Sequence, residues 1–478
     1  MLKDLGKNPL VRTDGYNLSH EYLKCNTDWE ISHMYNRKKG MILYGFNEIV
    51  NKLLQVTIEP WMIDEAEADA ISQGVTFPRE LFQRIIDECD GDIPIMVEAL
   101  PEGTWCPKGT PFAQIRNTVE GFGELVTWWE GVLMKAFFPS ACATRALEIR
   151  RYLEAKCKAG GYTWDSFRWR IHSFGYRGHR SEEDAYWAGT AWSMFISGTD
   201  DFHIVSHLRG SGLETGTIPA LAHKVTQQFD AEMECFKHAI DATAVKGGRI
   251  VALVIDTYDA WNVIESYVPS IAKYAETKGI RVVFRPDSGD VKEQVAAIHD
   301  IVVAYELTNV GCIIGDSLTF PQIIEADIWF TEENIPLDFV NYGLGAGFYN
   351  DITRDYLGWA MKTCYSNGKA RMKLVKGTPE KQSIPGEVYL QYDDGNQMVV
   401  HATGSIEDIE DGGTDELYGV AYCCSVVAPG VTIRTVPSDV DYGGISKLAL
   451  AQDTSQESII LSPVIHEMVK TFMEEYLD

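Results

Sequence analysis

The sequence lacks the cysteine spacings and the long apolar runs of disulfide-rich, zinc-binding and membrane-spanning proteins. Its ten cysteines include no CxxC pair, and the adjacent Cys423 and Cys424 are poorly placed to bridge each other. No apolar run approaches the length of a membrane span, and the first residues lack the apolar core of a signal peptide. We therefore expect reduced thiols, no membrane partner and a cytoplasmic protein.

The sequence is also short of positive charge. Lysine and arginine total 42 residues against 69 aspartates and glutamates, which gives a formal net charge of −27. A chain this acidic repels nucleic acid and anionic membranes, so neither is expected as a partner. An anionic substrate must instead be held locally, and we interpret the basic run 37–39 as solvated surface. The cations beside glycines or strand ends, which are the candidates, are Arg177, Arg285, Arg354 and Lys362.

The length of 478 residues exceeds what one simple core accommodates, so an α/β protein of two associated domains is expected. Residues 1–150 mix helical signals with short antiparallel strands. Residues 151–360 alternate strand, Gly/Asp turn and helix, which predicts an irregular or incomplete β/α barrel. Residues 361–478 are β-rich and are predicted to join the N-terminal segment in one composite α+β domain. The strands expected in the two outer segments include 93–100, 371–375 and 387–390.

Four apolar, strand-like segments of the central part end in carboxylates or glycines. Asp256, Asp287, Asp316 and Gly343 mark these ends at intervals of roughly 30 residues, the period of a βα unit. The carboxyl ends of parallel strands meet at one edge of a sheet, where α/β proteins build active sites. We therefore expect the four tips to lie together.

The chemistry of these tips suits a phosphorylated ribose. Carboxylates can hold ribose hydroxyls or share Mg²⁺ with a pyrophosphate, while glycine-rich backbone and Arg285 can hold phosphate oxygens. The helix that follows Gly289 is expected to offer free backbone N–H groups to an anion. Any single tip is explained equally well as a turn or a helix cap, but four in succession favour a sugar-phosphate site.

Several motifs, in order along the chain, carry a resemblance to a known family. They are Thr13-Asp14-Gly15-Tyr16 with His20, Leu43-Tyr44-Gly45-Phe46, Pro101-Glu102-Gly103, Phe174-Gly175-Tyr176-Arg177-Gly178, Gly198-Thr199-Asp200, residues 285–289, Gly315-Asp316 and Thr353-Arg354-Asp355. On these motifs the chain resembles the nicotinamide phosphoribosyltransferases, which are type II phosphoribosyltransferases, over nearly its full length. The resemblance implies an irregular β/α barrel with a composite α+β domain, and a homodimer whose active sites use residues of both subunits.

The resemblance implies that nicotinamide is sandwiched between Phe174 and Tyr16 of the partner subunit. Asp200 matches the carboxylate that accepts a hydrogen bond from the carboxamide and would repel nicotinic acid, which makes it the expected amide selector. Without the resemblance, Phe174 would be interpreted as a core aromatic and Asp200 as a helix cap.

The resemblance also implies the donor, phosphoribosyl pyrophosphate. Arg285 and Asp287 match residues at its ribose and pyrophosphate with Asp256 beside them, and the two aspartates are the expected Mg²⁺ ligands. Pyrophosphate leaves the anomeric carbon while the pyridine nitrogen attacks the opposite face, so catalysis rests on orientation and electrostatics. The other residues expected at the ribose hydroxyls and phosphates are Arg177, Gly315, Asp316, Gly345, Ala346, Arg354 and Lys362.

Departures from the family pattern concern ATP and the donor phosphate. His223 matches the histidine that family members phosphorylate with ATP, but Ala222 stands where a glutamate is usual, and a basic loop is reduced at 381–383. ATP as a cosubstrate is therefore left open, with a core or capping histidine as the alternative for His223. Ala346 and Ala360 replace a glycine and a serine at the phosphate end, which suggests a remodelled site.

The leading function is nicotinamide phosphoribosyl transfer in NAD salvage, and three alternatives are weighed against it. A larger donor, ADP-ribose pyrophosphate, would give NAD directly instead of nicotinamide mononucleotide. A nicotinate phosphoribosyltransferase is disfavoured by Asp200. A catalytically silent dimer that only binds nicotinamide is disfavoured by the joint presence of Asp256, Arg285, Asp287 and Asp316.

Overall fold

The computed structural model describes residues 8–23, 27–315, 318–378, 381–392, 397–402, 441–452, 455–457 and 460–477. The chain divides into two compact units, of which the first comprises residues 1–144 with 352–478 and the second residues 145–351. The boundaries expected from the sequence are residues 150 and 360. Within the described part of the chain, no helix is both long enough and apolar enough to cross a bilayer.

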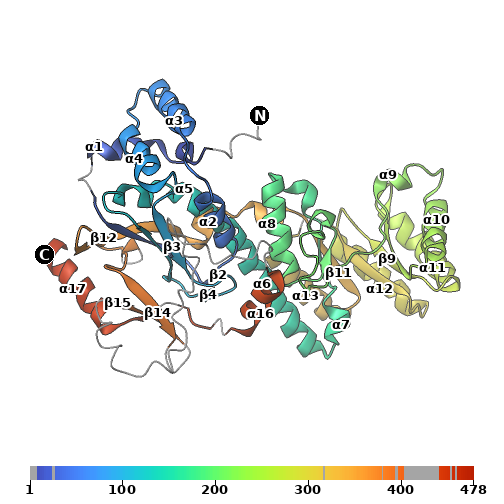
Figure 1. The fold of residues 1–478 in the computed structure, drawn as a ribbon. Coiled ribbons are helices and arrows are strands. Elements are labelled where there is room, and N and C mark those ends of the chain that lie inside the picture. Colours follow the sequence, from blue (N-terminus) through green and yellow to red (C-terminus); the bar gives the residue numbers. More distant parts are fainter. Residues whose placement is uncertain are drawn as a thin grey trace. The chain divides into compact units, whose positions relative to one another are not determined.

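The first unit contains an antiparallel sheet of five strands, in the order β13 (Lys369–Ala370), β12 (Trp359–Ser366), β1 (Glu30–Asn36), β5 (Pro111–Asn117) and β3 (Ile95–Ala99) (Figure 1). β1 is buried at every residue and pairs antiparallel with β12 on one side and β5 on the other. Because β1 and β12 lie far apart in sequence, the N-terminal segment and the segment after the barrel share one sheet. The strand expected at 93–100 is confirmed by β3.

A smaller sheet of the same unit joins β14 (Val388–Tyr392), β15 (Met398–Ala402) and β16 (Ile460–Leu461), and α17 (Pro463–Leu477) packs against β15 (Figure 1). β14 confirms the strand expected at 387–390. The strand expected at 371–375 is wrong, because its backbone bonds irregularly: Arg371 N donates to Cys364 O at 2.7 Å, and Lys373 N donates to Ser383 Oγ at 2.8 Å.

Short strands and helices complete the first unit. They are η1 (Pro9–Val11), η2 (Gly15–Ser19), α1 (His20–Leu23), β2 (Met41–Ile42), α2 (Phe46–Leu54), α3 (Pro60–Ser72), α4 (Arg79–Cys89), β4 (Trp105–Cys106), η3 (Gly123–Thr127), α5 (Glu130–Leu133), η4 (Met134–Ala136), the start of α6 (Phe137–Gly160), α15 (Arg354–Leu357) and α16 (Tyr442–Ala451).

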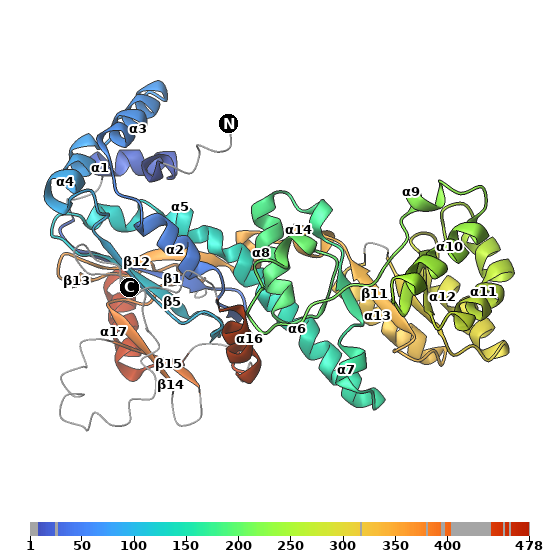
Figure 2. The same cartoon turned by 45° about the vertical axis from the view of Figure 1, so that its right-hand side comes forward.

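The second unit contains a parallel sheet of six strands, in the order β7 (Gly198–Thr199), β6 (Ile171–Ser173), β11 (Val340–Leu344), β10 (Val310–Ile314), β9 (Arg281–Arg285) and β8 (Ile250–Val254). β8, β9 and β10 are largely buried and rich in valine and isoleucine, as expected for strands covered on both faces. The helices that accompany them in Figure 2 are α10 (Glu232–Val245), α11 (Ala260–Thr277), α12 (Val291–Ala304) and α13 (Phe320–Glu332).

Aspartates fix where two of these helices begin. Asp259 accepts a hydrogen bond from Asn262 N at the start of α11, and Asp290 accepts one from Glu293 N at the start of α12. Each helix therefore starts a few residues after its strand and leaves a short loop at the strand's carboxyl end. The other elements of the unit are the remainder of α6, α7 (Trp164–Phe167), η5 (Tyr176–Gly178), α8 (Glu182–Ser193), η6 (Phe202–Ile204), α9 (His223–Thr226) and α14 (Gly347–Asn350).

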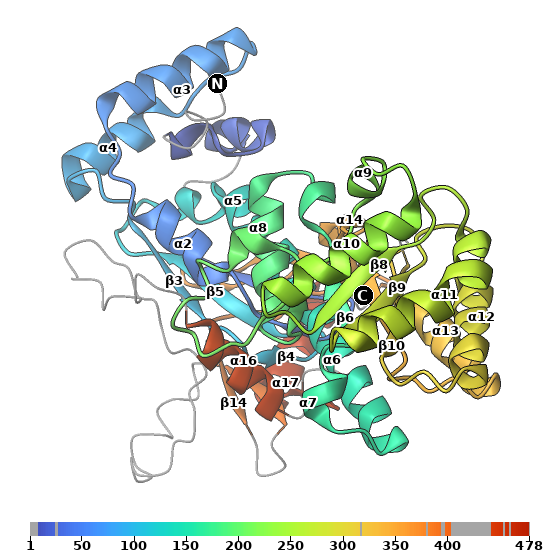
Figure 3. The ribbon, with the colours of Figure 1, turned by 90° about the vertical axis from the view of Figure 1, so that its right-hand side faces the viewer.

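Residues 216–221, hereafter the closing segment, connect the two edges of the parallel sheet. Gly216 forms a parallel bridge to Gly198 in β7, and Ala220 forms one to Ala252 in β8. Backbone hydrogen bonds of 2.8 to 3.0 Å secure both edges. The sheet is thereby closed into an irregular barrel, seen with its surrounding helices in Figure 3, which confirms the fold class expected from the sequence.

A fully satisfied ion pair lies inside this unit. Arg170 donates from both terminal nitrogens to the carboxylate of Asp327, and its Nε donates to Leu337 O at 2.6 Å. The hydroxyls of Tyr342 and Tyr152 donate to the same carboxylate at 2.6 and 2.7 Å. Arg170 and Asp327 expose 1% and 0% of their side chains, so the pair is part of the core.

Candidate active site

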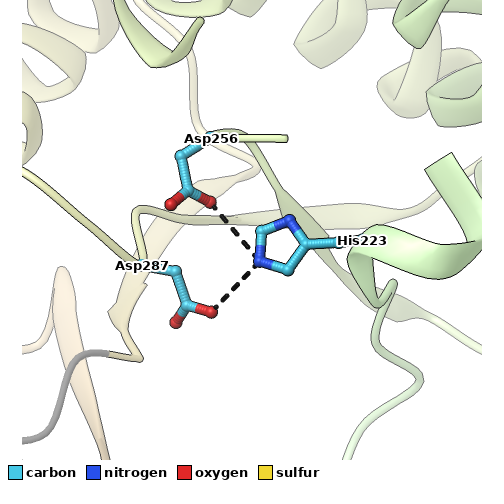
Figure 4. Close-up of side chains that lie close together, drawn as sticks. All are labelled: His223, Asp256 and Asp287. Atoms are coloured by element: carbon cyan, nitrogen blue, oxygen red, sulfur yellow. Dashed lines mark ion pairs between the residues drawn. The ribbon is translucent and has the colours of Figure 1, made fainter. Parts of the chain in front are cut away.

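A histidine and two aspartates lie together at the carboxyl ends of β8 and β9 (Figure 4). Asp256 and Asp287 each follow their strand by two residues, and His223 begins α9 shortly after the closing segment. His223 Nε2 lies 3.5 Å from Asp287 Oδ2 and 3.9 Å from Asp256 Oδ1. The other ring nitrogen, Nδ1, shares a hydrogen bond of 3.1 Å with Thr257 Oγ1. Residues from three separate loops thus meet at one edge of the sheet.

Arg285, Ser288 and Gly315 complete this group. Arg285 NH2 lies 3.6 Å from Asp287 Oδ2, and Ser288 Oγ donates to Asp256 Oδ2 at 2.5 Å. A Cβ at position 315 would lie 1.9 Å from Asp287 Oδ1, so glycine at the end of β10 leaves room for the carboxylate. The exposed fractions of Asp256, Arg285 and Asp287 are 8%, 15% and 24%, so the charges are only partly solvated.

The two carboxylates fit a divalent cation. Asp256 Oδ1 is buried and has no hydrogen-bond partner among the described residues, and it points toward His223 (Figure 4). One potential ligand atom from each of His223, Asp256 and Asp287 lies within 4.8 Å of the others. Mg²⁺ prefers oxygen ligands, so Asp256 and Asp287, the pair expected from the sequence, are suited to hold it.

A small cavity beside Arg285 is lined by Phe174 and Asp200, the two residues of this unit expected at the pyridine ring. Phe174 N donates to Leu344 O in β11 at 2.7 Å, and its ring fills the space over Gly343, where a Cβ would lie 2.0 Å from the ring. The remaining lining residues are His172, Thr217, Ile218, Ala220, Ala252 and Ile313. The cavity thus combines an aromatic wall, apolar walls and a carboxylate beside the acidic strand ends.

Asp200 presents its carboxylate to this cavity, while Asp201 shapes the turn that carries the aromatic wall. Thr217 Oγ1 donates to Asp200 Oδ1, and Asp200 N donates to Ser173 O at 2.9 Å. The buried Asp201 accepts hydrogen bonds from Ser173 Oγ and Tyr176 N. Since η6 begins after Asp201, the alternative that Asp200 caps a helix is wrong.

A larger cavity of about 450 Å³ adjoins the small one inside the barrel unit. The two share His172, Thr217, Ile218 and Ile313. Burial lowers the pKa of His172, and the nearby Asp200 carboxylate partly offsets this effect. The imidazole is therefore a neutral hydrogen-bonding group in the shared wall near neutral pH.

The glycine-rich turn after β11 lies against the turn that carries Arg177. A Cβ at Gly178 would lie 2.9 Å from the Cβ of Ala346, and Phe348 N donates to Gly345 O at 3.2 Å. Arg177 itself is exposed in η5. The structure therefore brings the Arg177 turn and the Gly345 turn together at the ends of β6 and β11.

Two predictions about the site of the ribosyl donor are not confirmed by the structure. The prediction that α12 offers free N–H groups to an anion is wrong at Glu293 N, because Asp290 accepts its hydrogen bond at 3.3 Å and places a negative charge at the helix start. Asp316, expected at the ribose hydroxyls, lies outside the described residues, although Gly315 beside it is described.

Arg354 and Lys362 belong to the first unit, where they form a cation group with Arg37. Burial lowers the pKa of Lys362, and the positive charges of Arg37 and Arg354 lower it further. The neighbouring Glu130 carboxylate partly offsets these effects. Burial also lowers the pKa of Arg37, whose Nε and NH2 are buried without a partner in the described chain. The interpretation of this basic run as solvated surface is therefore wrong at Arg37, and a bound anion would satisfy the group. Tyr16, in the same unit, is 55% exposed.

The residues missed from the sequence are mostly neighbours of those expected. Thr257 and Ser288 directly follow Asp256 and Asp287 at the strand ends, and that position is the signal that would have found them. Thr217 had no such signal, because it lies in the closing segment, which forms no regular strand.

Comparisons with known proteins agree with this geometry. Residues 169–383 match the model of the nicotinate phosphoribosyltransferase (NAPRTase) family. A nicotinamide phosphoribosyltransferase of Xanthomonas campestris pv. campestris is 25% identical over 379 residues, covering 74% of this chain and 80% of that protein. One of Acinetobacter baylyi is 26% identical over 430 residues, covering 76% and 84%. The sequence resemblance to this group of enzymes is thus confirmed.

Solved structures support the fold. Human nicotinic acid phosphoribosyltransferase superposes with a TM-score of 0.60 at 16% identity, covering 96% of this chain and 99% of that one. Nicotinate-nucleotide pyrophosphorylase from Pyrococcus furiosus superposes with a TM-score of 0.57 at 15% identity, covering 95% and 97%. At these identities the likeness shows the architecture of a type II phosphoribosyltransferase and leaves the choice between amide and acid substrates to the residues of the cavity.

Proposed function

This chain is a phosphoribosyltransferase, and hence a pentosyltransferase, related to the NAPRTase family, and we propose that its acceptor substrate is nicotinamide. The proposed reaction joins nicotinamide to phosphoribosyl pyrophosphate and yields nicotinamide mononucleotide and pyrophosphate, a step of NAD salvage. The observation that carries the proposal is one cavity lined by Phe174, Asp200 and Arg285. A carboxylate accepts a hydrogen bond from a carboxamide N–H but repels the carboxylate of nicotinic acid, so this cavity favours the amide.

The proposed mechanism relies on orientation and on fixed charges. Phe174 stacks on the pyridine ring and Asp200 accepts the carboxamide N–H, which holds the ring for attack on the anomeric carbon. Asp256 and Asp287 stabilise the positive charge that develops on the ribose as the bond to pyrophosphate breaks. Bound Mg²⁺ would neutralise the leaving pyrophosphate.

Arg285 is suited to bind an oxygen of the donor. Its Nε is buried and lacks a partner within the described residues, although its NH2 approaches Asp287. A buried guanidinium N–H without an acceptor is unfavourable, and an oxygen of ribose or pyrophosphate would supply one. Arg285 therefore gains a hydrogen bond when the donor binds.

The first unit contributes to the proposed site through a homodimer. Tyr16 of the partner subunit would cover the second face of the pyridine ring, and the cation group of Arg37, Arg354 and Lys362 would bind the donor phosphate. Mixing inactive Tyr16→Ala chains with inactive Asp287→Asn chains tests this arrangement. Shared sites predict recovery of roughly a quarter of wild-type activity, because half of the dimers are mixed and each carries one intact site. Two inactive chains that stay inactive when mixed would contradict it.

ADP-ribose pyrophosphate is a second candidate donor. Ala360 and Lys362 are two positions apart in β12 and therefore lie on the same face of the strand. That face presents the lysine cation but has no hydroxyl at position 360. A terminal phosphate would lose one hydrogen bond there, whereas a longer donor is less dependent on that contact. Supplying each donor separately with nicotinamide and identifying the product by mass spectrometry distinguishes the mononucleotide from NAD.

The proposed transfer itself consumes no ATP, so ATP coupling through His223 is an addition that a separate experiment tests. Residues 381–383 form the loop that has fewer basic residues than the family pattern. Its last residue, Ser383, is buried and accepts a hydrogen bond from Lys373 N. His223 is 41% exposed and so is accessible to a phosphoryl donor. Measuring the yield of mononucleotide with and without ATP, in wild type and in His223→Ala, tests whether the coupling operates.

Amide selection is the sharpest test of the proposed acceptor. Wild-type enzyme is expected to use nicotinamide with a kcat/KM at least about a hundredfold above that for nicotinic acid. Asp200→Ser removes the repulsive charge and is expected to reduce this ratio at least tenfold, chiefly by improving use of the acid. Asp300→Ser, which alters an exposed carboxylate on α12 of the same unit, serves as the control. A preference unchanged in Asp200→Ser would contradict the role of Asp200.

A further inference from the structure

The group at the ends of β8 and β9 holds more acceptor atoms than positive charge. Asp256 and Asp287 carry two negative charges, and among the described residues Arg285 is the one lysine or arginine in contact with them, with NH2 3.6 Å from Asp287 Oδ2. A second positive charge would therefore be favourable between His223, Asp256 and Asp287.

The free atoms of these three side chains point at the same place. The side chain of Asp256 is only 8% exposed. Its Oδ1 nevertheless has no hydrogen-bond partner among the described residues, and it faces His223 (Figure 4). Nε2 of His223 lies 3.9 Å from that atom and 3.5 Å from Asp287 Oδ2. Such a buried, unpaired oxygen is costly unless a ligand or an ion completes it.

The opposite atoms of the same side chains are already held. Nδ1 of His223 is paired with Thr257 Oγ1 at 3.1 Å, and Oδ2 of Asp256 accepts from Ser288 Oγ at 2.5 Å. Metal-binding histidines and carboxylates have this arrangement, in which a second contact fixes the ring and the carboxylate so that the remaining atom faces the ion. When Nδ1 donates to Thr257, Nε2 carries a lone pair.

The two separations that involve His223 are close to those of ligands on one ion, and all three side chains offer an atom within 4.8 Å of the others. For bonds of about 2.1 Å, two ligand atoms lie about 3.0 Å apart at a right angle and about 3.4 Å apart at the tetrahedral angle. The observed separations of 3.5 and 3.9 Å exceed the tetrahedral spacing by about 0.1 and 0.5 Å and the right-angle spacing by about 0.5 and 0.9 Å, and a rotation of the partly exposed His223 shortens both.

We propose that His223 Nε2, Asp256 Oδ1 and Asp287 Oδ2 together bind a divalent transition-metal ion directly, with Mn²⁺ as the best-fitting ion. One imidazole nitrogen and two carboxylate oxygens suit Mn²⁺ better than Mg²⁺, which forms few bonds to nitrogen and retains its water. Thr257 and Ser288 act as positioning residues for the ligands. The 41% exposure of His223 leaves other coordination positions of the ion open to water or to an anionic ligand.

The experiment titrates the full-length protein with Mn²⁺ alone and follows the loss of the free-ion electron paramagnetic resonance signal. Wild type is expected to bind one Mn²⁺ per chain, with nitrogen hyperfine coupling in the pulsed spectrum. His223→Ala should weaken binding at least tenfold and abolish the nitrogen coupling, and Asp256→Asn and Asp287→Asn should weaken it at least tenfold. Thr257→Val should weaken it about tenfold by releasing the ring.

The matched control is His238→Ala, which removes an exposed histidine on α10 of the same unit and should leave binding unchanged. Circular dichroism and thermal unfolding of each variant separate loss of the ion from loss of the fold. Binding that is unaffected by His223→Ala, or that shows no nitrogen coupling, overturns the proposal in favour of carboxylates alone. Absence of Mn²⁺ binding by wild type overturns it outright. The titration contains only the protein and Mn²⁺, so its outcome does not depend on whether the proposed reaction is correct.

Discussion

Two arginine–aspartate pairs in the barrel unit differ in how completely they are satisfied. In the pair of Arg170 and Asp327, both guanidinium ends and the Nε are bonded, and two tyrosine hydroxyls complete the carboxylate. In the pair of Arg285 and Asp287, the charges are 3.6 Å apart and the arginine Nε has no partner in the described chain. The first pair closes a core, whereas the second leaves the Arg285 Nε unpaired among the described residues and available to a ligand.

The contrast shows how the same two residue types serve stability or chemistry. Burial alone raises the pKa of Asp327, but hydrogen bonds from Arg170 and the tyrosines outweigh it and hold the pKa below its usual value. Asp327 is therefore ionised and paired near neutral pH. At the strand ends, incomplete pairing leaves acceptor and donor atoms available for a sugar, a pyrophosphate or a metal ion.

The largest expected effect comes from breaking the core pair. Asp327→Asn leaves Arg170 as a buried charge without a counterion and should lower the free energy of unfolding by about 3–5 kcal/mol. Urea denaturation followed by circular dichroism measures it. Asp241→Asn, at an exposed aspartate paired with Lys278, is the control and should cost less than about 1 kcal/mol. A loss of similar size in both variants would erase the contrast between buried and exposed pairs.

Removing the arginine at the strand ends should instead affect the reaction. Arg285→Gln is expected to lower kcat/KM about 10²–10³-fold, because a charged donor to the substrate is lost where charge develops. The free energy of unfolding should change by less than about 1 kcal/mol, since the wild-type pair is not closed. Steady-state kinetics and denaturation of one preparation provide both numbers. A variant that unfolds easily but retains its activity would reverse the assignment of roles.

A carboxyl held by backbone amides sharpens the comparison further. Glu102 accepts from Gly45 N at 2.7 Å and Asn47 N at 2.8 Å, and none of its partners in the described chain is an arginine. Burial raises its pKa to about 7 despite these bonds. The folded state therefore retains a proton between pH 4.5 and 7 that the unfolded chain loses, so the stabilising contribution declines as pH rises through this window.

Comparing the pH dependence of unfolding in wild type and Glu102→Gln measures this contribution. Wild type should lose on the order of 2–3 kcal/mol more than the variant between pH 4.5 and pH 7. Glu80→Gln, an exposed position on α4, should leave the slope as in wild type. Parallel slopes in wild type and Glu102→Gln would show that the proton is not bound there.

The smallest effect is expected at the cavity wall. Gly343→Ala places a methyl group 2.0 Å from the Phe174 ring, which must then move away from its position beside β11. The KM for nicotinamide should rise about tenfold with little change in the KM for the donor. Ala252→Gly, which removes a methyl group from another wall of the same cavity, is the control for volume alone. Equal effects on both substrates would indicate general disturbance of the barrel.

The strand-end pattern predicted the barrel and the acids at its rim because it depends on local order. A β-branched run followed by Asp, Ser or Gly defines a strand and its loop, and this placed Asp256, Arg285 and Asp287 at one edge. The closing segment was not predictable, because isolated bridges at Gly216 and Ala220 have no repeating pattern. Nor was the environment of Arg37 predictable, because two of its charged neighbours, Glu130 and Arg354, lie far along the chain.

Product identification tests the central claim most directly. Wild-type enzyme is incubated with ring-labelled nicotinamide, phosphoribosyl pyrophosphate and Mg²⁺, and the products are separated and identified by mass spectrometry alongside an enzymatic measurement of pyrophosphate. The account predicts labelled nicotinamide mononucleotide and pyrophosphate in equal amounts, both lost in Arg285→Gln. Mononucleotide formed only when labelled nicotinic acid replaces the amide, or no pyrophosphate release with either ring, would contradict it.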